Sequence, residues 1–302
     1  MRKESFNMKK LILSLCLLAA YIFPNFTALA KEEEPEKIVV GYYAGWAAYK
    51  GYTPDQLPVE MLTHINYAFA KIDPASGKVV LADPSMDHKN LKALQQLKKK
   101  NPHLKVLLSV GGWDYSAYFS DVALTPEKRE TFARSCIELI INYELDGVDL
   151  DWEYPVSGGK DGNVNRPEDQ KNFTLLLRAV RDQLNRQGEA DGHSYLLTIA
   201  AAANSGYLKK IEPEKAAGIV DFVFLMSYDY HGPWDSYADL NAPLYMPTEW
   251  SPQYKNSVDD SIQTYLRAGI PAGKIVMGIP LYGYLYEQVS EAGYGLSLIH
   301  IS

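Results

Sequence analysis

The chain has 302 residues, of which 47% are hydrophobic and 22% are charged, and its formal net charge is −7. This composition is that of a globular protein and excludes collagen-like, coiled-coil and low-complexity disordered chains. The acidic balance also argues against a nucleic-acid-binding surface, because binding to phosphates requires a basic face.

Residues 1–30 have the pattern of a secretory signal peptide. A short basic stretch precedes the apolar run 11–20, which is too short to span a bilayer, and residues 28–30 (Ala-Leu-Ala) match a cleavage site. We therefore expect cleavage after this site, secretion, and no membrane association of the mature chain. Cleavage would leave Cys136 without a partner cysteine, so we expect no intramolecular disulfide and assign this residue to the core.

Seven short apolar runs follow along the chain. They are residues 38–43, 64–70, 105–110, 148–152, 196–201, 222–226 and 275–280. Continuous apolar runs of this length are typical of parallel strands covered on both faces. Apolar residues at helical spacing lie between the runs, in segments that begin near Pro126, Pro167 and Val258. The α/β alternation predicts a (β/α)8 TIM barrel in preference to a doubly wound sheet, because no Gly-rich dinucleotide-binding turn is present.

Seven strands are one fewer than a complete barrel needs. We expect residues 31–295 to form an incomplete TIM-barrel catalytic domain whose last βα unit is missing. Residues 296–302 match the translation of a transposon-adapter sequence common in DNA libraries, so we interpret them as a sequencing artefact. The alternative is a genuine short C-terminal strand. A barrel left open would expose two strand edges, so the chain as written is expected to fold poorly or to be inactive.

The fourth run carries acids at alternate positions: Asp149, Asp151 and Glu153. Strand side chains alternate between the two faces, so these three point together into the barrel, while Trp152 faces the helices. Like charges this close cannot all ionise, and at least one proton is retained. Glu153 stands at the C-terminal strand end, where barrel active sites form, which predicts a general acid. No His lies at ligand spacing beside these acids, so we expect neither a metal nor another cofactor.

These residues carry a resemblance to a known family. The pattern D-x-x-D-x-D-x-E at residues 146–153 resembles the signature of glycoside hydrolase family 18, the chitinases. Residues 109–112 (SVGG) and 226–229 (MSYD) resemble the family's S-x-G-G and M-x-Y-D segments, in the same order and on the corresponding strands. The resemblance covers about residues 37–285, and the run 153–159 is similar to bacterial, processive-type members.

The resemblance implies that chitin is hydrolysed at its β-1,4-N-acetylglucosamine linkages by a retaining, substrate-assisted mechanism. In that mechanism Glu153 protonates the glycosidic oxygen, and the acetamido carbonyl of the −1 sugar attacks the anomeric carbon. Asp151 orients the acetamide N–H, and Asp149 supports these charges from below. Tyr228 donates a hydrogen bond to the attacking carbonyl, and Asp229 binds the distorted −1 sugar.

The resemblance also implies a cleft that binds chitin and N-acetylglucosamine oligosaccharides. The residues expected to line this cleft are Tyr42, Trp46, Phe69, Gly112, Trp113, Tyr154, Met226, Trp234 and Tyr282. Met226 would form the floor of the −1 subsite, and Tyr154 and Tyr282 are candidate polar contacts. For Phe69 and Trp234, ordinary packing is an equal alternative.

Some features depart from the family pattern. The eighth strand, which brings a Trp under the −1 sugar, and most of an insertion domain are missing, and Gly283-Tyr284 stand where many relatives have Gly-Arg. Three alternatives stay open: an endo-β-N-acetylglucosaminidase acting on N-glycans, a peptidoglycan hydrolase, and a non-catalytic chitin-binding lectin. Lectins of this fold usually lose the acid found here at Glu153. Nothing indicates an oligomer, so a monomer is expected.

Overall fold

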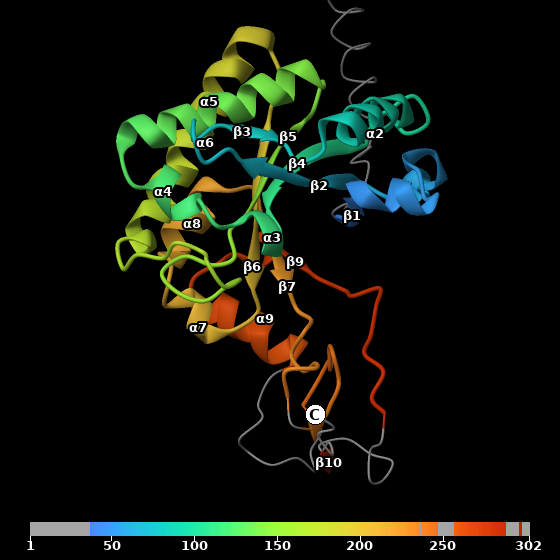
Figure 1. Ribbon diagram of the computed structural model, residues 1–302, viewed down its shortest axis with the longest axis vertical. Helices are drawn as coiled ribbons and strands as arrows, with labels where there is room; N and C mark the ends of the chain where they lie inside the picture. The colour runs from blue at the N-terminus through green and yellow to red at the C-terminus, as the bar shows by residue number, and fades with distance from the viewer. Residues whose placement is uncertain (1–36, 236, 247–256, 288–295, 298–302) are drawn as a thin grey trace, which may run out of the picture. The chain divides into compact units, whose positions relative to one another are not determined.

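The computed structural model describes residues 37–235, 237–246, 257–287 and 296–297, and it divides the chain into Met1–Lys37 and Ile38–Ser302. Within the second unit, seven parallel strands form one sheet in the order β1-β2-β4-β5-β6-β7-β9 (Figure 1). The strands are β1 Val40–Ala44, β2 His64–Ile72, β4 Lys105–Gly111, β5 Gly147–Asp151, β6 Leu196–Ala202, β7 Phe222–Met226 and β9 Ile275–Met277. All seven expected strands are confirmed, and the curled sheet with its helices is a partial (β/α)8 barrel.

Helices and short 3-10 turns connect the strands. The α-helices are α2 Pro84–Leu97, α3 Gly112–Tyr115, α4 Phe119–Ala123, α5 Pro126–Asn142, α6 Asp169–Asp191, α7 Ser205–Leu208, α8 Pro213–Ile219 and α9 Val258–Arg267. The 3-10 segments are η1 Gly45–Lys50, η2 Pro54–Gln56, η3 Val59–Met61 and η4 Ala272–Lys274. Local signals set the helix starts: the Thr125 side chain accepts the Lys128 N–H ahead of α5, and Ser257 caps α9 in the same way.

Aromatic rings pack in the core between the sheet and helices α4 and α6. Trp152 stacks on Phe119 with ring centroids 5.3 Å apart, and the Phe173 ring lies edge-on at 5.8 Å. Cys136 is fully buried on α5. Because Trp152 faces the helices, the alternation of side chains turns its neighbours Asp151 and Glu153 the other way.

Two strands were not expected from the sequence, and a third falls where a genuine short C-terminal strand had been left open as the alternative. β3 (Val79–Leu81) pairs antiparallel with the end of β2, and β8 (Tyr237–Ala238) pairs antiparallel with β10 (Leu296–Ser297). The remainder of 296–302 lies outside the described residues, so its interpretation as an adapter translation stays a prediction, as does the signal peptide at 1–30. Within the described residues, no helix has the length and apolar character needed to cross a bilayer.

Candidate active site

The deepest acid, Asp149, is held by hydroxyl groups from three other strands. Its Oδ2 accepts hydrogen bonds from Tyr42 Oη on β1 at 2.9 Å and Ser109 Oγ on β4 at 2.7 Å, and its Oδ1 accepts one from Thr198 Oγ1 on β6 at 2.7 Å. The carboxyl is fully buried, and burial raises its pKa although the three hydroxyls act in the opposite direction. Burial and the Asp149 charge likewise raise the pKa of Tyr42.

Asp151, at the C-terminal end of β5, is buried next to both other acids. Burial raises its pKa well above the ordinary value, and the negative charges of Glu153 and Asp149 raise it further. Among the described residues, its Oδ1 has no hydrogen-bond partner. A buried carboxylate oxygen without a donor is costly in the free protein. Asp151 therefore offers an acceptor, in a low-dielectric setting, to an N–H brought by a ligand.

Glu153 follows the strand end and is 8% exposed. Burial raises its pKa from 4.5 to about 7, opposed by a hydrogen bond with the Tyr154 side chain and reinforced by the charges of Asp229 and Asp114. A carboxyl with this pKa still carries its proton for much of the time near neutral pH, as a general acid must. Glu153 is thus the most exposed of the three acids, and burial raises the pKa of all three.

A second group of polar residues lies beyond β7. Asp229 has φ +56°, and its Oδ1 accepts hydrogen bonds from Tyr282 Oη and Tyr284 Oη, both at 2.7 Å. The Tyr228 ring lies 6.1 Å from that of Tyr282 and packs where a Cβ on Gly278 would approach within 2.9 Å. Burial raises the Tyr228 pKa, and the charges of Asp151 and Glu153 add to this, so its neutral hydroxyl stays a donor within electrostatic reach of the acids.

Three of the expected sugar-binding aromatics lie within β2 or directly after β1 and β4. Trp46, in η1, and Phe69, in β2, have ring centroids 6.3 Å apart, and Trp46 is half exposed. Gly112 has φ +72°, and a Cβ there would lie 2.7 Å from the Phe69 ring, so glycine makes room for that ring. Trp113, the first residue after this glycine, is half exposed.

The other expected residues lie either beside the three acids or in and after β7. The Tyr154 ring is edge-on to that of Tyr207 at 6.0 Å, beside Glu153, and Met226 ends β7 half-buried. Trp234 lies in the loop well past β7 rather than at a strand end, is 61% exposed, and contacts the Tyr284 ring at 5.7 Å.

Three of the residues around the acids were given no role from the sequence, although Ser109 lies in the SVGG segment. Ser109 and Thr198 are polar residues within apolar strands, and that contrast could have marked both as partners of a buried charge. Tyr207 is buried, its hydroxyl has no partner among the described residues, and burial followed by the charges of Asp151 and Glu153 raises its pKa. No sequence pattern points to Tyr207, which lies on the short helix α7.

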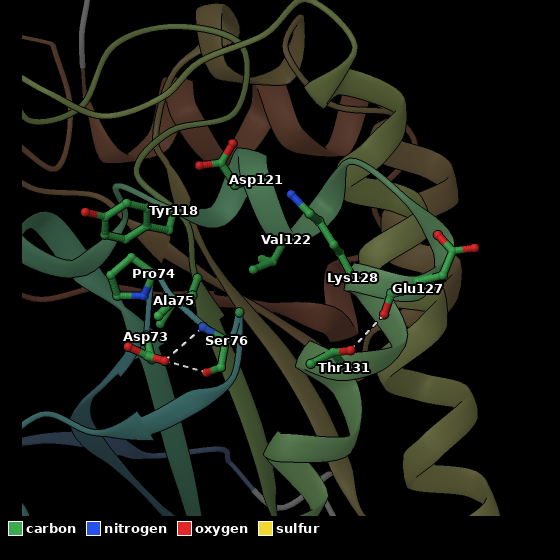
Figure 2. A pocket seen from close by; sticks show the side chains of 12 residues that line it. Asp73, Pro74, Ala75, Ser76, Tyr118, Asp121, Val122, Glu127, Lys128 and Thr131 are labelled. Carbon is green, nitrogen blue, oxygen red and sulfur yellow. Dashed lines mark hydrogen bonds between the residues drawn. The ribbon is translucent and has the colours of Figure 1, made fainter.

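A surface pocket of about 240 Å³ lies elsewhere, between the β2–β3 turn, α4 and the start of α5 (Figure 2). Three of its polar side chains have partners within the protein. Asp73 accepts a hydrogen bond from the Ser76 backbone N–H at 3.0 Å, Asp121 pairs with Arg166 at 2.7 Å, and the Thr131 hydroxyl donates to a main-chain carbonyl. None of the acids Asp149, Asp151 and Glu153 lines this pocket.

Comparison with known proteins agrees with this geometry. Residues 38–297 match the sequence model of the family described as Glycosyl hydrolases family 18. Chitinase A1 of Niallia circulans is 40% identical over 95% of this chain and 48% of its own length. Chitinase 1 of Aphanocladium album is 33% identical over 83% of this chain and 62% of its own length. The chain therefore spans about half to two thirds of the length of these curated relatives.

Solved structures of family 18 enzymes are also similar to this chain in fold. Chitinase ChiA74 from Bacillus thuringiensis superposes with a TM-score of 0.78 at 35% identity, covering 81% of this chain and 48% of that one. A family 18 N-acetylglucosaminidase from Paenibacillus barengoltzii superposes with a TM-score of 0.71 at 40% identity, covering 80% of this chain and 67% of that one.

Proposed function

This chain belongs to glycosyl hydrolase family 18, and from that membership we propose that the whole protein is a chitinase acting by a retaining, substrate-assisted mechanism. One observation carries the proposal: Glu153, whose pKa burial raises to about 7, follows a buried Asp151 whose Oδ1 lacks a donor among the described residues. The pair supplies a proton at one atom and an acceptor for an amide N–H at another. A 2-acetamido sugar needs both groups for its own carbonyl to act as the nucleophile.

In the first step, the Glu153 proton passes to the glycosidic oxygen as the bond from the anomeric carbon to that oxygen breaks. The acetamido carbonyl oxygen of the −1 sugar bonds to the anomeric carbon and forms an oxazolinium ion. Asp151 accepts the acetamide N–H and stabilises the positive charge, while Tyr228 donates to the carbonyl oxygen and aligns it. An intramolecular nucleophile held in this way gains a large effective concentration.

In the second step, the Glu153 carboxylate accepts a proton from water as the water oxygen bonds to the anomeric carbon from the same face. The oxazolinium ring opens, the acetamide is restored, and Glu153 is again protonated. Two displacements at one carbon retain its configuration. Three hydroxyl groups hold Asp149 in place by hydrogen bonds. Its negative charge raises the pKa of Asp151, so the two carboxyl groups titrate together.

For binding, we propose that the exposed aromatic rings stack on successive N-acetylglucosamine units. Trp46 and Trp113 are half exposed just after β1 and β4, and β4 is the neighbour of the acid-bearing strand β5 in the sheet order. Asp229 and Tyr282, joined by a hydrogen bond, would contact the −1 sugar from the β7 side. The substrate is then chitin or its oligosaccharides, and the protein is proposed to act as a secreted monomer after loss of residues 1–30.

A second candidate activity differs only in the product. The similarity to an N-acetylglucosaminidase of the same family favours considering release of single sugars beside cleavage to longer oligosaccharides. Both activities would use the same acid row. Chromatography of the products from N-acetylglucosamine hexamers distinguishes them, because single-sugar release yields monomer from the earliest times.

The test is hydrolysis by the protein expressed from its complete gene. We expect release of N-acetylglucosamine oligosaccharides from colloidal chitin and no release of N-glycans from a glycoprotein. Glu153→Gln is the matched control, because it keeps the shape of the side chain and removes the transferable proton. Chitin binding without hydrolysis by the wild type would refute the enzyme and support the lectin, and glycan release would support the endo-β-N-acetylglucosaminidase.

A further inference from the structure

The main chain of Glu153 lies beyond the strand ladder. The last residue of β5 in register with β4 is Asp151, opposite Gly111. The N–H and C=O of Glu153 are nevertheless both occupied, and by side chains. Its N–H donates to Ser116 Oγ at 2.9 Å, and its C=O accepts from Asn163 Nδ2 at 2.8 Å.

Ser116 comes from the loop that follows β4 and is fully buried. Its hydroxyl donates to the Gly112 carbonyl at 2.8 Å, and its oxygen lies 3.1 Å from the Asp151 carbonyl oxygen. A hydroxyl has one proton and two lone pairs. With the proton directed to Gly112, the lone pairs accept the Glu153 N–H, so one oxygen joins the turn after β4 to the peptide of the acid.

Asn163 comes from the loop that follows β5 and binds the next peptide along, because the Glu153 C=O belongs to the Glu153–Tyr154 peptide whereas its N–H belongs to the Trp152–Glu153 peptide. This loop approaches so closely that a Cβ on Gly159 would lie 2.1 Å from the Glu153 carbonyl oxygen and 2.7 Å from Asn163 Nδ2. The two loops also bond directly, since the Val164 N–H donates to the Ala117 carbonyl at 3.2 Å. The two loops thus hold the two peptide groups that flank the Cα of Glu153.

We propose that Ser116 and Asn163 are positioning residues that fix the direction of the Glu153 carboxyl by holding its main-chain N–H and C=O. The inference rests on the proposed role of Glu153 as the acid that protonates the glycosidic oxygen. Because the side chain leaves from a peptide outside the ladder, the two hydrogen bonds replace those that a strand would supply. A misplacement of about 1 Å can lower a rate by about 100-fold.

The test measures kcat and KM for Ser116→Ala and Asn163→Ala in the full-length protein with an N-acetylglucosamine oligosaccharide. We expect kcat to fall roughly 10- to 100-fold in each, with KM within about twofold, because the sugar-contacting residues are untouched. If the carboxyl also leaves its buried position, its pKa falls, and the alkaline limb of the kcat profile moves to lower pH. A purely structural loss would leave that limb in place.

Ser135→Ala is a matched control for the buried serine. Ser135 also accepts a backbone N–H, from Val79 at 2.8 Å, and also donates to a carbonyl, that of Phe132 at 2.7 Å, but it lies on α5. Asn165→Ala is the control for the loop, since its exposed amide bonds Gly158 and Asn163 carbonyls rather than Glu153. Both controls should keep the wild-type kcat and pH profile.

The outcomes separate the two claims. Wild-type kcat and pH profile in both Ser116→Ala and Asn163→Ala would overturn the positioning role and leave the proposed function standing. If Ser116→Ala does not fold, the kcat and pH profile of Asn163→Ala decide. Asn163 is half-buried and lies on a surface loop, so its substitution is compatible with folding. A wild type that does not hydrolyse the oligosaccharide would refute the proposed function, and the inference with it.

Discussion

Replacing Glu153 by Gln should make the protein more stable at neutral pH while removing its activity. In the unfolded chain the carboxyl has its ordinary pKa of 4.5, and burial raises the pKa to about 7 in the folded protein. The difference corresponds to about 3 kcal/mol, since one pKa unit is about 1.4 kcal/mol. Folding therefore favours the protonated acid, and ionisation above neutral pH opposes folding.

The direction of the Glu153 pKa shift determines the pH range in which Glu153→Gln is more stable than the wild type. Below pH 4.5 Glu153 is protonated in both the folded and the unfolded state, so its ionisation does not change the free energy of unfolding. Between pH 4.5 and 7 the unfolded chain ionises while the folded protein keeps its proton, so the free energy of unfolding falls by about 3 kcal/mol. Gln cannot ionise, so Glu153→Gln avoids this loss. Loss of the Glu153 charge also lowers the pKa of Asp151, which acts in the same direction at high pH.

The assay is thermal unfolding of wild type and Glu153→Gln from pH 4 to pH 8. The difference in Tm should grow by roughly 6 °C over this range, because 1 kcal/mol shifts Tm by about 2 °C in a domain of about 250 residues. Other titrating groups are common to both proteins and largely cancel. A Tm difference that is the same at pH 4 and pH 8 would refute the reasoning that burial keeps this carboxyl protonated.

Further predictions concern single residues. Glu153→Gln should bind chitopentaose with nearly wild-type affinity by calorimetry while releasing no product, and wild-type turnover would contradict its role as the acid. Asp151→Asn should lower kcat by at least about 100-fold, as removal of a positioned charge partner does, and full activity would exclude substrate assistance through Asp151. Gly111→Ala should lower Tm and soluble yield, since φ is +107° and the new Cβ would lie 2.2 Å from the Asp151 carbonyl oxygen; an unchanged melting curve argues against this close approach. The Cys136 thiol is buried and its pKa is raised by burial, so it should react with a thiol reagent only after denaturation, and labelling of the native protein would show it is accessible.

The strands and the direction of the acids could be predicted because each depends on a local pattern. Continuous apolar runs marked the parallel strands, and the period of two in a strand placed Asp149, Asp151 and Glu153 on one face. Helix α2 was not predicted, because its buried side includes polar residues. Asp87 there accepts a hydrogen bond from Tyr67 Oη at 2.6 Å, and Asn90 donates to a carbonyl at 3.0 Å.

The partners of the acids needed the register between strands and the paths of two loops. Tyr42 is far from Asp149 in the chain, and only the pairing of β1, β2, β4 and β5 brings them together. Ser116 and Asn163 lie in segments without hydrophobic periodicity, where no spacing rule relates them to Glu153. A signature in the sequence can thus point to candidate reacting groups, whereas the groups that hold them become visible only in the folded chain.

The central claim is that Glu153 and Asp151 act with the substrate's own acetamide in two displacements. The most direct measurement follows the anomeric protons of the product by NMR during the first minutes of chito-oligosaccharide hydrolysis by the full-length protein. If the acetamide is the nucleophile, the β-anomer forms first and then mutarotates to the α-anomer. Initial formation of the α-anomer would mean direct attack by water on the opposite face and would exclude the two-displacement mechanism.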